Sequence, residues 1–179
     1  MITVFPLLVS LMIEHNVLSV YILPFAIAPI FIRVFLDSRT AFNAHVTMVL
    51  ICAAAVKYQY EFIIVQLVAG LIAIYSLREL SQRAEIFKTA LLVTAGSCGI
   101  YFALQLMQDN SILTMDHGMY KYFIANGVLL LFAYPLMLVI EKMFGFISNV
   151  TLIELSNTNK KLLRDLSQVA PGTFQHSIM

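Results

Sequence analysis

Histidine, cysteine and carboxylate side chains are the residues whose types could support metal or nucleophilic chemistry in this chain. Asp109, Asp116 and His117 fall in the polar stretch 108–121, but two carboxylates at this spacing do not form the oxygen cage of a calcium site. We interpret the stretch as a solvated loop. His176, near the C-terminus, offers a lone imidazole, which does not hold a divalent metal well by itself. Each cysteine lies inside an apolar run and is interpreted as a packing residue; these are Cys52 and Cys98.

The composition predicts a membrane protein. Hydrophobic residues make up 60% of the chain and charged residues 12%, with a mean hydropathy of +0.87, whereas soluble domains carry about 25% charged residues. One aqueous core cannot hide this much apolar surface, so lipid must be the solvent. The formal net charge is +1, so there is no general basic signal, and we expect no nucleic-acid partner.

Six apolar segments predict an all-α, polytopic membrane helix bundle of about six helices. A helix needs roughly 20 apolar residues to cross a bilayer, so the first segment is too short to span alone. The runs are continuous rather than alternating, which argues against a membrane β-barrel. The short connections favour antiparallel neighbours. The segments are 2–13, 17–36, 41–56, 62–77, 86–107 and 122–140.

Lysine and arginine residues gather at one end of these segments and predict the orientation. The opposite end carries only Lys57 and Lys121. Because loops rich in Lys and Arg stay in the cytoplasm, we predict that the richer end and the C-terminal tail are cytoplasmic. The residues of the richer end are Arg33, Arg39, Arg78, Arg83, Lys88 and Lys142.

Polar residues inside the apolar segments are interpreted first as structural. Arg33 lies near the end of its segment and is expected to extend its charge to the interface. His45 and Glu61 also lie near segment ends, so we expect both at the interface. Gln66 and Asn126 lie deeper and are expected to make hydrogen-bonded contacts between helices rather than to bind a substrate.

Prolines and small residues predict the shape of the helices. Pro24, Pro29 and Pro135 can kink a helix or line a cavity. Small residues let two helices approach closely. We expect such contacts at residues 53–55, which are all alanine, and at Ala95, Gly96 and Gly99.

After residue 145 the chain becomes polar, with a recurring apolar position. The apolar residues are separated by 3, 7, 4 and 3 positions, which lies on one helical stripe; they are Leu152, Leu155, Leu162, Leu166 and Val169. Either a helix lying on the membrane surface or a stalk that transmits motion or dimerises would have this pattern. Pro171 and Gly172 then end the helix.

Two runs of the tail resemble a known family. Residues 154–164 (ELSNTNKKLLR) and 170–179 (APGTFQHSIM) resemble the entry to the cytoplasmic domain of seven-transmembrane HD hydrolases, which are bacterial membrane proteins of the type that degrades cyclic di-AMP. Residues 134–136 (YPL) and 141–145 (EKMFG) resemble the end of that family's last membrane helix. Residues 23–29 (LPFAIAP) resemble an earlier membrane helix of the family.

The resemblance implies three parts and a cellular location. The transmembrane bundle would occupy residues 1–145, a cytoplasmic amphipathic linker helix 146–170, and the start of an HD phosphohydrolase domain 171–179. The protein would lie in the bacterial inner membrane and cross it several times. Its partners would be the lipid bilayer, a cyclic dinucleotide substrate, and a second copy that pairs through residues 151–169.

The resemblance also implies a metal site that this chain does not complete. In that family the HD site binds two metal ions, commonly iron or manganese, through His and Asp residues, and His176 matches the first metal-ligand histidine. The later ligands have no counterpart here, so we expect neither a cofactor nor hydrolysis from these residues alone. The longer protein would be a metal-dependent phosphodiesterase, and this region would act as its membrane sensor and anchor.

Two departures keep other classes open. The family has seven membrane helices and an extracellular domain, whereas this sequence shows six segments and no such domain. A small-molecule transport module of the vitamin type also has six helices and a similar length. It would use Pro24, Pro29 and Asn126 as a pocket, but it does not explain the polar tail. A structural membrane scaffold is the third class.

Overall fold

The described part of the protein is helical. The structure, a computed structural model, describes residues 3–15, 19–77, 85–109 and 117–145, together with 168, 169 and 172. These ranges contain no β-strand, which confirms the predicted all-α class. The elements are α1 (Val4–His15), η1 (Val20–Ile22), α2 (Ile27–Phe35), α3 (Ser38–Ala53), α4 (Gln59–Ser76), α5 (Glu85–Asp109), η3 (His117–Met119), α6 (Tyr120–Leu131) and α7 (Ala133–Phe144).

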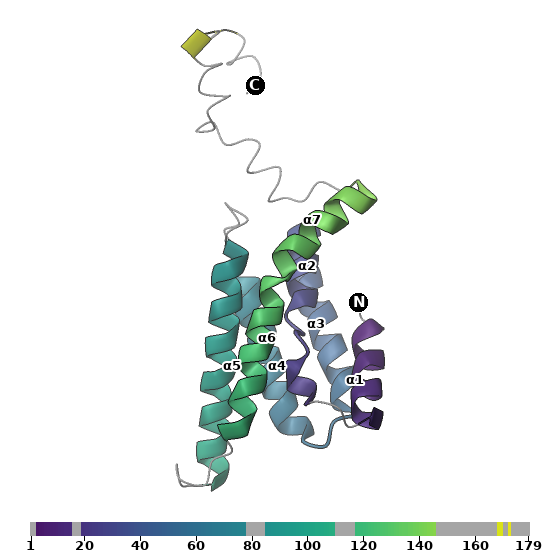
Figure 1. The fold of residues 1–179 in the computed structure, drawn as a ribbon, viewed down its shortest axis with the longest axis vertical. Coiled ribbons are helices and arrows are strands. Elements are labelled where there is room, and N and C mark those ends of the chain that lie inside the picture. Colours follow the sequence, from purple (N-terminus) through teal and green to yellow (C-terminus); the bar gives the residue numbers. More distant parts are fainter. Residues whose placement is uncertain are drawn as a thin grey trace.

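Helices that follow one another in the sequence pack side by side. α2 contacts α3, α3 contacts α4, α4 contacts α5, and α5 contacts α6. Figure 1 shows them running along the long axis of one bundle, as the short connections predicted. We call the end at which α1 ends and α4 begins the lower end, and the end at which α5 begins and α7 ends the upper end (Figure 1).

The first helix, α1, covers only part of the bundle. It has 12 residues and packs against α3 and η1. Its buried side chains are Phe5 and Val9. In Figure 1 it runs along the lower part of the bundle only, which agrees with the prediction that the first segment is too short to span.

The predicted second segment, 17–36, is not one continuous helix. It is divided into η1 and α2, because the backbone at Leu23 is extended, with φ −67° and ψ 125°. Pro24 explains the break, since proline disfavours the helical conformation of the residue before it. Pro29, by contrast, lies in the first turn of α2, where no amide hydrogen is needed. The prediction that a proline can kink this segment is confirmed at Pro24.

The predicted sixth segment is also interrupted. α6 ends at Leu131 and α7 begins at Ala133, with Phe132 at the junction. Pro135 is the third residue of α7, and its ring would clash with the carbonyl of Leu131 in a continuous helix. The next amide, that of Leu136, resumes the pattern by donating to the Phe132 carbonyl at 3.1 Å. In Figure 1, α7 leans away from the direction of α6.

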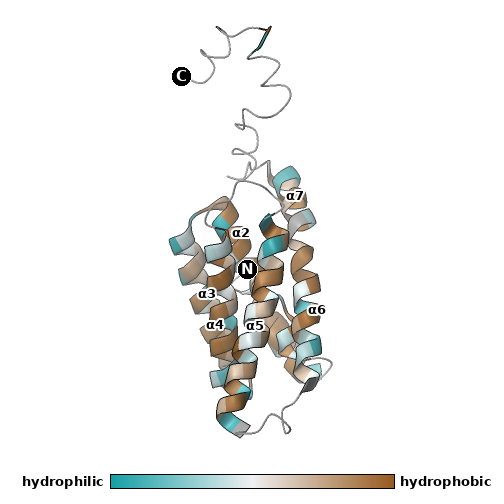
Figure 2. Cartoon of the chain, turned by 90° about the vertical axis from the view of Figure 1, so that its left-hand side faces the viewer, coloured by the Kyte–Doolittle hydropathy of each residue, from teal (hydrophilic) through white to brown (hydrophobic). Residues whose placement is uncertain are grey.

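Three of the described stretches are long and apolar enough to cross a bilayer. They are Gln59–Ser76, Glu85–Gln108 and Tyr120–Phe144, the last of which joins α6 and α7. The apolar stretches Val4–His15 and Val20–Phe35 are shorter. Figure 2 shows hydrophobic colouring along most of the length of the helices.

The buried residues form two layers of different composition. The lower layer is aromatic and includes Phe5, Tyr21, Phe25, Phe62, Tyr101 and Phe123. The upper layer is built mainly from small and aliphatic residues, among them Ala69, Ala73, Ala90, Leu130 and Ala133, with Phe31 as a buried aromatic side chain. Small side chains let the helices approach closely at the upper end, whereas ring packing fills the space around the interrupted helix at the lower end.

Candidate functional site

The break between η1 and α2 is stabilised from another helix. An interrupted helix leaves backbone carbonyls without their usual partners, and in a membrane these must be satisfied by protein. Asn126, in α6, donates from Nδ2 to the carbonyl oxygens of Tyr21 at 3.0 Å and Leu23 at 2.7 Å. This confirms the prediction that Asn126 makes a hydrogen-bonded contact between helices. Both hydrogens of its amide nitrogen are donated to backbone carbonyls at the end of η1.

A buried tyrosine and carboxylate pair lies beside this break. The Tyr21 hydroxyl donates to Oε1 of Glu61 at 3.1 Å, and the two residues are 4% and 9% exposed. Glu61 lies in the first turn of α4, as its predicted position near a segment end required. Its side chain is not solvated there, because the carboxylate is enclosed against Tyr21. The pair links η1 to α4.

Aromatic rings connect these polar groups to α5 and α6. Tyr21 has its ring centroid 5.9 Å from that of Phe62 and 5.5 Å from that of Phe123. Tyr101 lies 5.3 Å from Phe123, and its hydroxyl accepts a hydrogen bond from Gln105 at 3.2 Å. We call Tyr21, Glu61, Phe123 and Asn126 the junction cluster, because together they join η1, α4 and α6.

A second polar contact locks α3 to α4. His45 is 1% exposed and lies two turns inside α3, so the prediction that it sits at the interface is wrong. Its Nε2 donates to the carbonyl oxygen of Gln66 at 2.8 Å, since a carbonyl can only accept. The buried Nδ1 has no hydrogen-bond partner among the described residues. Gln66 is buried, but this contact is made by its backbone carbonyl, so the expected interhelical hydrogen bond of its side chain stays a prediction.

Gly70 makes room for this histidine, and the sequence patterns did not identify it. A Cβ atom at position 70 would collide with the His45 ring. Gly70 follows Gln66 by one helical turn on α4, so the ring rests against both residues. A glycine inside a strongly apolar helix was the available signal, because it often marks a close approach of two elements.

The other small-residue predictions have mixed outcomes. A Cβ at Gly96 would collide with Ile72 of α4, which confirms a close approach there. Gly99 has open space around it, so that prediction is wrong. α3 ends at Ala53, and residues 54 and 55 are exposed, so only the first of the three alanines packs as expected. A further close approach, between Gly127 and Thr94, was not predicted.

The turn between α2 and α3 carries a helix cap. The Asp37 carboxylate accepts from the backbone amides of Arg39 at 2.9 Å and Thr40 at 3.1 Å, and from the Thr40 hydroxyl. These hydrogen bonds, those of Thr40 first, lower the pKa of Asp37 below its ordinary value. Arg33 lies in the last turn of α2, near the end of its segment as predicted, where a cation suits the helix dipole. It is partly buried.

Several predicted features lie outside the described residues. These are His176, Asp116, the predicted linker helix 146–170 apart from residues 168 and 169, and the predicted HD start 171–179 apart from Gly172. Within the described residues, no group of three or more His, Cys, Asp or Glu side chains is placed to hold a metal ion. Cys52 is buried in the lower layer and Cys98 packs at its edge, which confirms the packing interpretation of both.

The fold defines a multi-pass helical membrane protein, and the comparisons define its family. A family described as "7TM receptor with intracellular HD hydrolase" matches residues 1–148. The chain belongs to this family, as the tail and the last apolar segment predicted. No solved structure matches the chain.

Two curated relatives share this region. The chain is 27% identical over 178 residues to "Cyclic-di-AMP phosphodiesterase PgpH" of Bacillus subtilis (strain 168), covering 93% of this chain and 24% of that protein. It is 26% identical over 196 residues to the protein of the same name from Listeria monocytogenes serotype 1/2a (strain 10403S), covering 100% of this chain and 26% of that protein. The chain thus spans about a quarter of the length of these relatives.

Proposed function

We propose that this chain is the membrane sensor and anchor region of a bacterial, metal-dependent phosphodiesterase that hydrolyses a cyclic dinucleotide, cyclic di-AMP in the first instance. The observation that carries this proposal is the similarity to two cyclic-di-AMP phosphodiesterases over 93% and 100% of the chain. The similarity to the Listeria protein extends over the tail that holds His176. The transport alternative loses its pocket argument, because the Asn126 amide is bonded to the backbone of η1.

The bundle would pass a signal to the cytoplasm through its two interrupted helices. η1 lies against α6, and α2 lies against α7. The junction cluster links η1 to α6, so a displacement of η1 would also displace α6. α7 then leads into residues 146–170, the predicted linker to the hydrolase domain.

The catalytic part of the proposal is tested on the full-length gene product. Hydrolysis of cyclic di-AMP would be measured with Mn²⁺ or Fe²⁺ for the wild type and for His176→Ala, with His15→Ala, an exposed histidine of α1, as the matched control. Loss of hydrolysis in His176→Ala alone is expected, because an HD site needs each of its metal ligands. Equal rates for all three proteins would overturn the assignment of His176 as a metal ligand.

Orientation in the inner membrane is tested by labelling single cysteines in intact cells. In a background with Cys52→Ala and Cys98→Ala, the exposed positions are compared as Arg39→Cys and Lys57→Cys. A membrane-impermeant maleimide should label only Lys57→Cys, because the end rich in Lys and Arg stays inside. Labelling of Arg39→Cys alone would reverse the topology and place the tail outside.

Dimerisation through residues 151–169 is tested separately. Leu162→Asp places a charge in the middle of the predicted apolar stripe, whereas Lys161→Asp changes its neighbour off the stripe. The mass of the detergent-solubilised full-length protein should fall to that of a monomer only for Leu162→Asp. An unchanged dimer in Leu162→Asp would exclude the stripe as the interface.

A further inference from the structure

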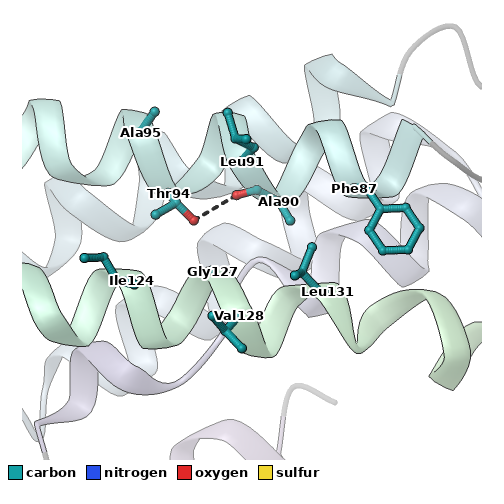
Figure 3. A pocket seen from close by; sticks show the side chains of 9 residues that line it. All are labelled: Phe87, Ala90, Leu91, Thr94, Ala95, Ile124, Gly127, Val128 and Leu131. Carbon is teal, nitrogen blue, oxygen red and sulfur yellow. Dashed lines mark hydrogen bonds between the residues drawn. The ribbon is translucent and has the colours of Figure 1, made fainter.

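An open apolar groove of about 500 Å³ runs between α5 and α6. Its floor is formed by small residues, among them Ala90, Thr94 and Gly127, as Figure 3 shows. The two helices meet closely here, because a side chain at Gly127 would collide with Thr94. The Thr94 hydroxyl donates to the Ala90 carbonyl at 2.9 Å, so the only hydroxyl in the lining already has an acceptor.

The walls of the groove project outward from the bundle. Leu91 on α5 is 71% exposed, and Ile124 and Val128 on α6 are 59% and 52% exposed. Figure 3 shows these side chains extending from the two helices that flank the floor. In a bilayer, this face of α5 and α6 meets hydrocarbon rather than water.

The length of the groove suits one lipid tail. On α5 its lining extends from Phe87 to Ala95, about 12 Å at a rise of about 1.5 Å per residue. The hydrocarbon core is about 30 Å thick, so the groove reaches through less than one leaflet. An acyl chain ends near the bilayer centre, so its length within one leaflet matches that of the groove.

Exposed lysines at the upper end of the bundle indicate that the lipid head group would be anionic. Lys88 is exposed and follows the first groove residue, Phe87, near the start of α5. Lys142 is exposed in the last turn of α7, which ends at the same end of the bundle (Figure 1). At the other end of the groove, Lys121 already lies over the Tyr122 ring, with Nζ 5.0 Å from the ring centroid.

From these observations we propose that the groove between α5 and α6 binds one acyl chain of an anionic phospholipid, with its phosphate beside Lys88. The small floor residues accept the chain, and the walls of Leu91, Ile124 and Val128 hold it laterally. This inference depends on the chain lying in a bilayer, but it does not depend on hydrolysis or on which end faces the cytoplasm.

The absence of tryptophan from the chain allows a direct test. Ile124→Trp places a single fluorophore on the groove wall, and Leu71→Trp places one on the exposed face of α4. Each is reconstituted in phosphatidylcholine vesicles with a minor fraction of brominated phosphatidylglycerol or brominated phosphatidylcholine, whose bromine atoms quench nearby tryptophan. The groove position should favour phosphatidylglycerol about five-fold, the effect of one lysine near the membrane surface, and Leu71→Trp should show no preference.

Two pairs of variants in the Ile124→Trp protein locate the lipid. Lys88→Gln should abolish the preference, and Lys121→Gln should keep it. Ala95→Phe fills the groove, whereas Gly99→Phe adds similar bulk one turn away in open space, so only the former should reduce quenching. Equal quenching by the two lipids at Ile124→Trp would overturn the anionic lipid. Protection of Ile124→Trp from both lipids would show that protein covers the groove, which also overturns the proposal.

Discussion

The side-chain amide of Asn126 lies 2.7 Å from the carbonyl oxygen of Leu23 and so joins two interrupted helices that are 103 residues apart in the sequence. Leu23 is the residue at which the first interruption occurs, and Asn126 precedes the second, at Phe132, by less than two turns. The two breaks therefore lie in neighbouring elements that are tied to each other. Each break is associated with a proline, and Figure 1 shows that α7 changes direction after the second of them.

Asn126→Leu should destabilise the bundle. It removes the donor to the Tyr21 carbonyl and leaves the Leu23 carbonyl with the Phe25 amide alone, at 2.9 Å. An unsatisfied buried group costs about 1 to 3 kcal/mol in folded proteins. Hydrogen bonds between membrane helices average only about 0.6 kcal/mol, so we expect a total loss of about 1 to 2 kcal/mol. Unfolding of the detergent-solubilised chain measures it.

Asn43→Leu is the matched control for this substitution, since Asn43 is exposed on α3. Its stability should stay within about 0.5 kcal/mol of the wild type, as is usual for surface positions. If both variants lost the same stability, the bonds of Asn126 would have no special role at the break.

Gly70→Ala should be strongly destabilising for a substitution of this size. The new Cβ would overlap the His45 ring, and overpacking of this kind costs about 1 to 3 kcal/mol. In a His45→Ala background the same substitution should be neutral or favourable, because alanine is the better helix former. A double-mutant cycle measures the coupling, and simple additivity of the two changes would contradict the contact.

Gly99→Ala provides the reference for this cycle. Gly99 lies in α5 with nothing near its missing side chain, so alanine should stabilise the helix by up to about 1 kcal/mol. The opposite signs expected at Gly70 and Gly99 separate crowding from helix propensity.

The helices could be predicted from the sequence because continuous apolar runs indicate them directly. Their interruptions could be anticipated less well. Pro24 follows the end of η1 and lies outside any helix. Pro29 and Pro135, by contrast, lie in the first turns of α2 and α7. All three look alike as isolated prolines in apolar runs, and only the position of the helix start distinguishes their effects.

The sequence could predict that buried polar residues make contacts between helices, but it could not predict which residues they contact. The interhelical role of Asn126 followed from its depth in an apolar run, but its partners are set by tertiary packing. His45 was misplaced because the apolar run begins at residue 41, while α3 begins at Ser38 behind the Asp37 cap. Asp37, a residue that commonly caps helix starts, was the local signal that α3 begins before residue 41. With that start, His45 lies two turns inside α3.

Tyr21→Phe and Glu61→Gln should be energetically coupled. The hydroxyl of Tyr21 donates to Oε1 of Glu61 at 3.1 Å, so each substitution alone removes or weakens the same hydrogen bond. Once one partner is changed, changing the other should have little further effect. We expect a coupling energy of about 1 kcal/mol from a double-mutant cycle in detergent.

Tyr120→Phe is the control for that cycle. Tyr120 contacts the same aromatic group through Tyr101, with ring centroids 5.5 Å apart, but belongs to α6. Its substitution should add to that of Glu61→Gln without coupling. Equal coupling for Tyr21 and Tyr120 would mean that a general change in ring packing, and not the hydrogen bond, produces the effect.

The cap at Asp37 should make the start of α3 sensitive to acid. The pKa of Asp37 is lower in the folded chain than its ordinary value, so its contribution to stability is present above the ordinary value and is lost as the pH falls through the folded value. Asp37→Asn keeps a good capping oxygen but cannot titrate, whereas Asp37→Ala loses the cap at every pH. Thermal unfolding of the three proteins between about pH 7 and about pH 3 separates these cases. The unfolding temperature of the wild type should approach that of Asp37→Ala only at the acid end. The difference in unfolding temperature between Asp37→Asn and Asp37→Ala should be the same at every pH. A wild-type chain that followed Asp37→Asn down to the lowest pH would show that the carboxylate charge contributes nothing to the cap.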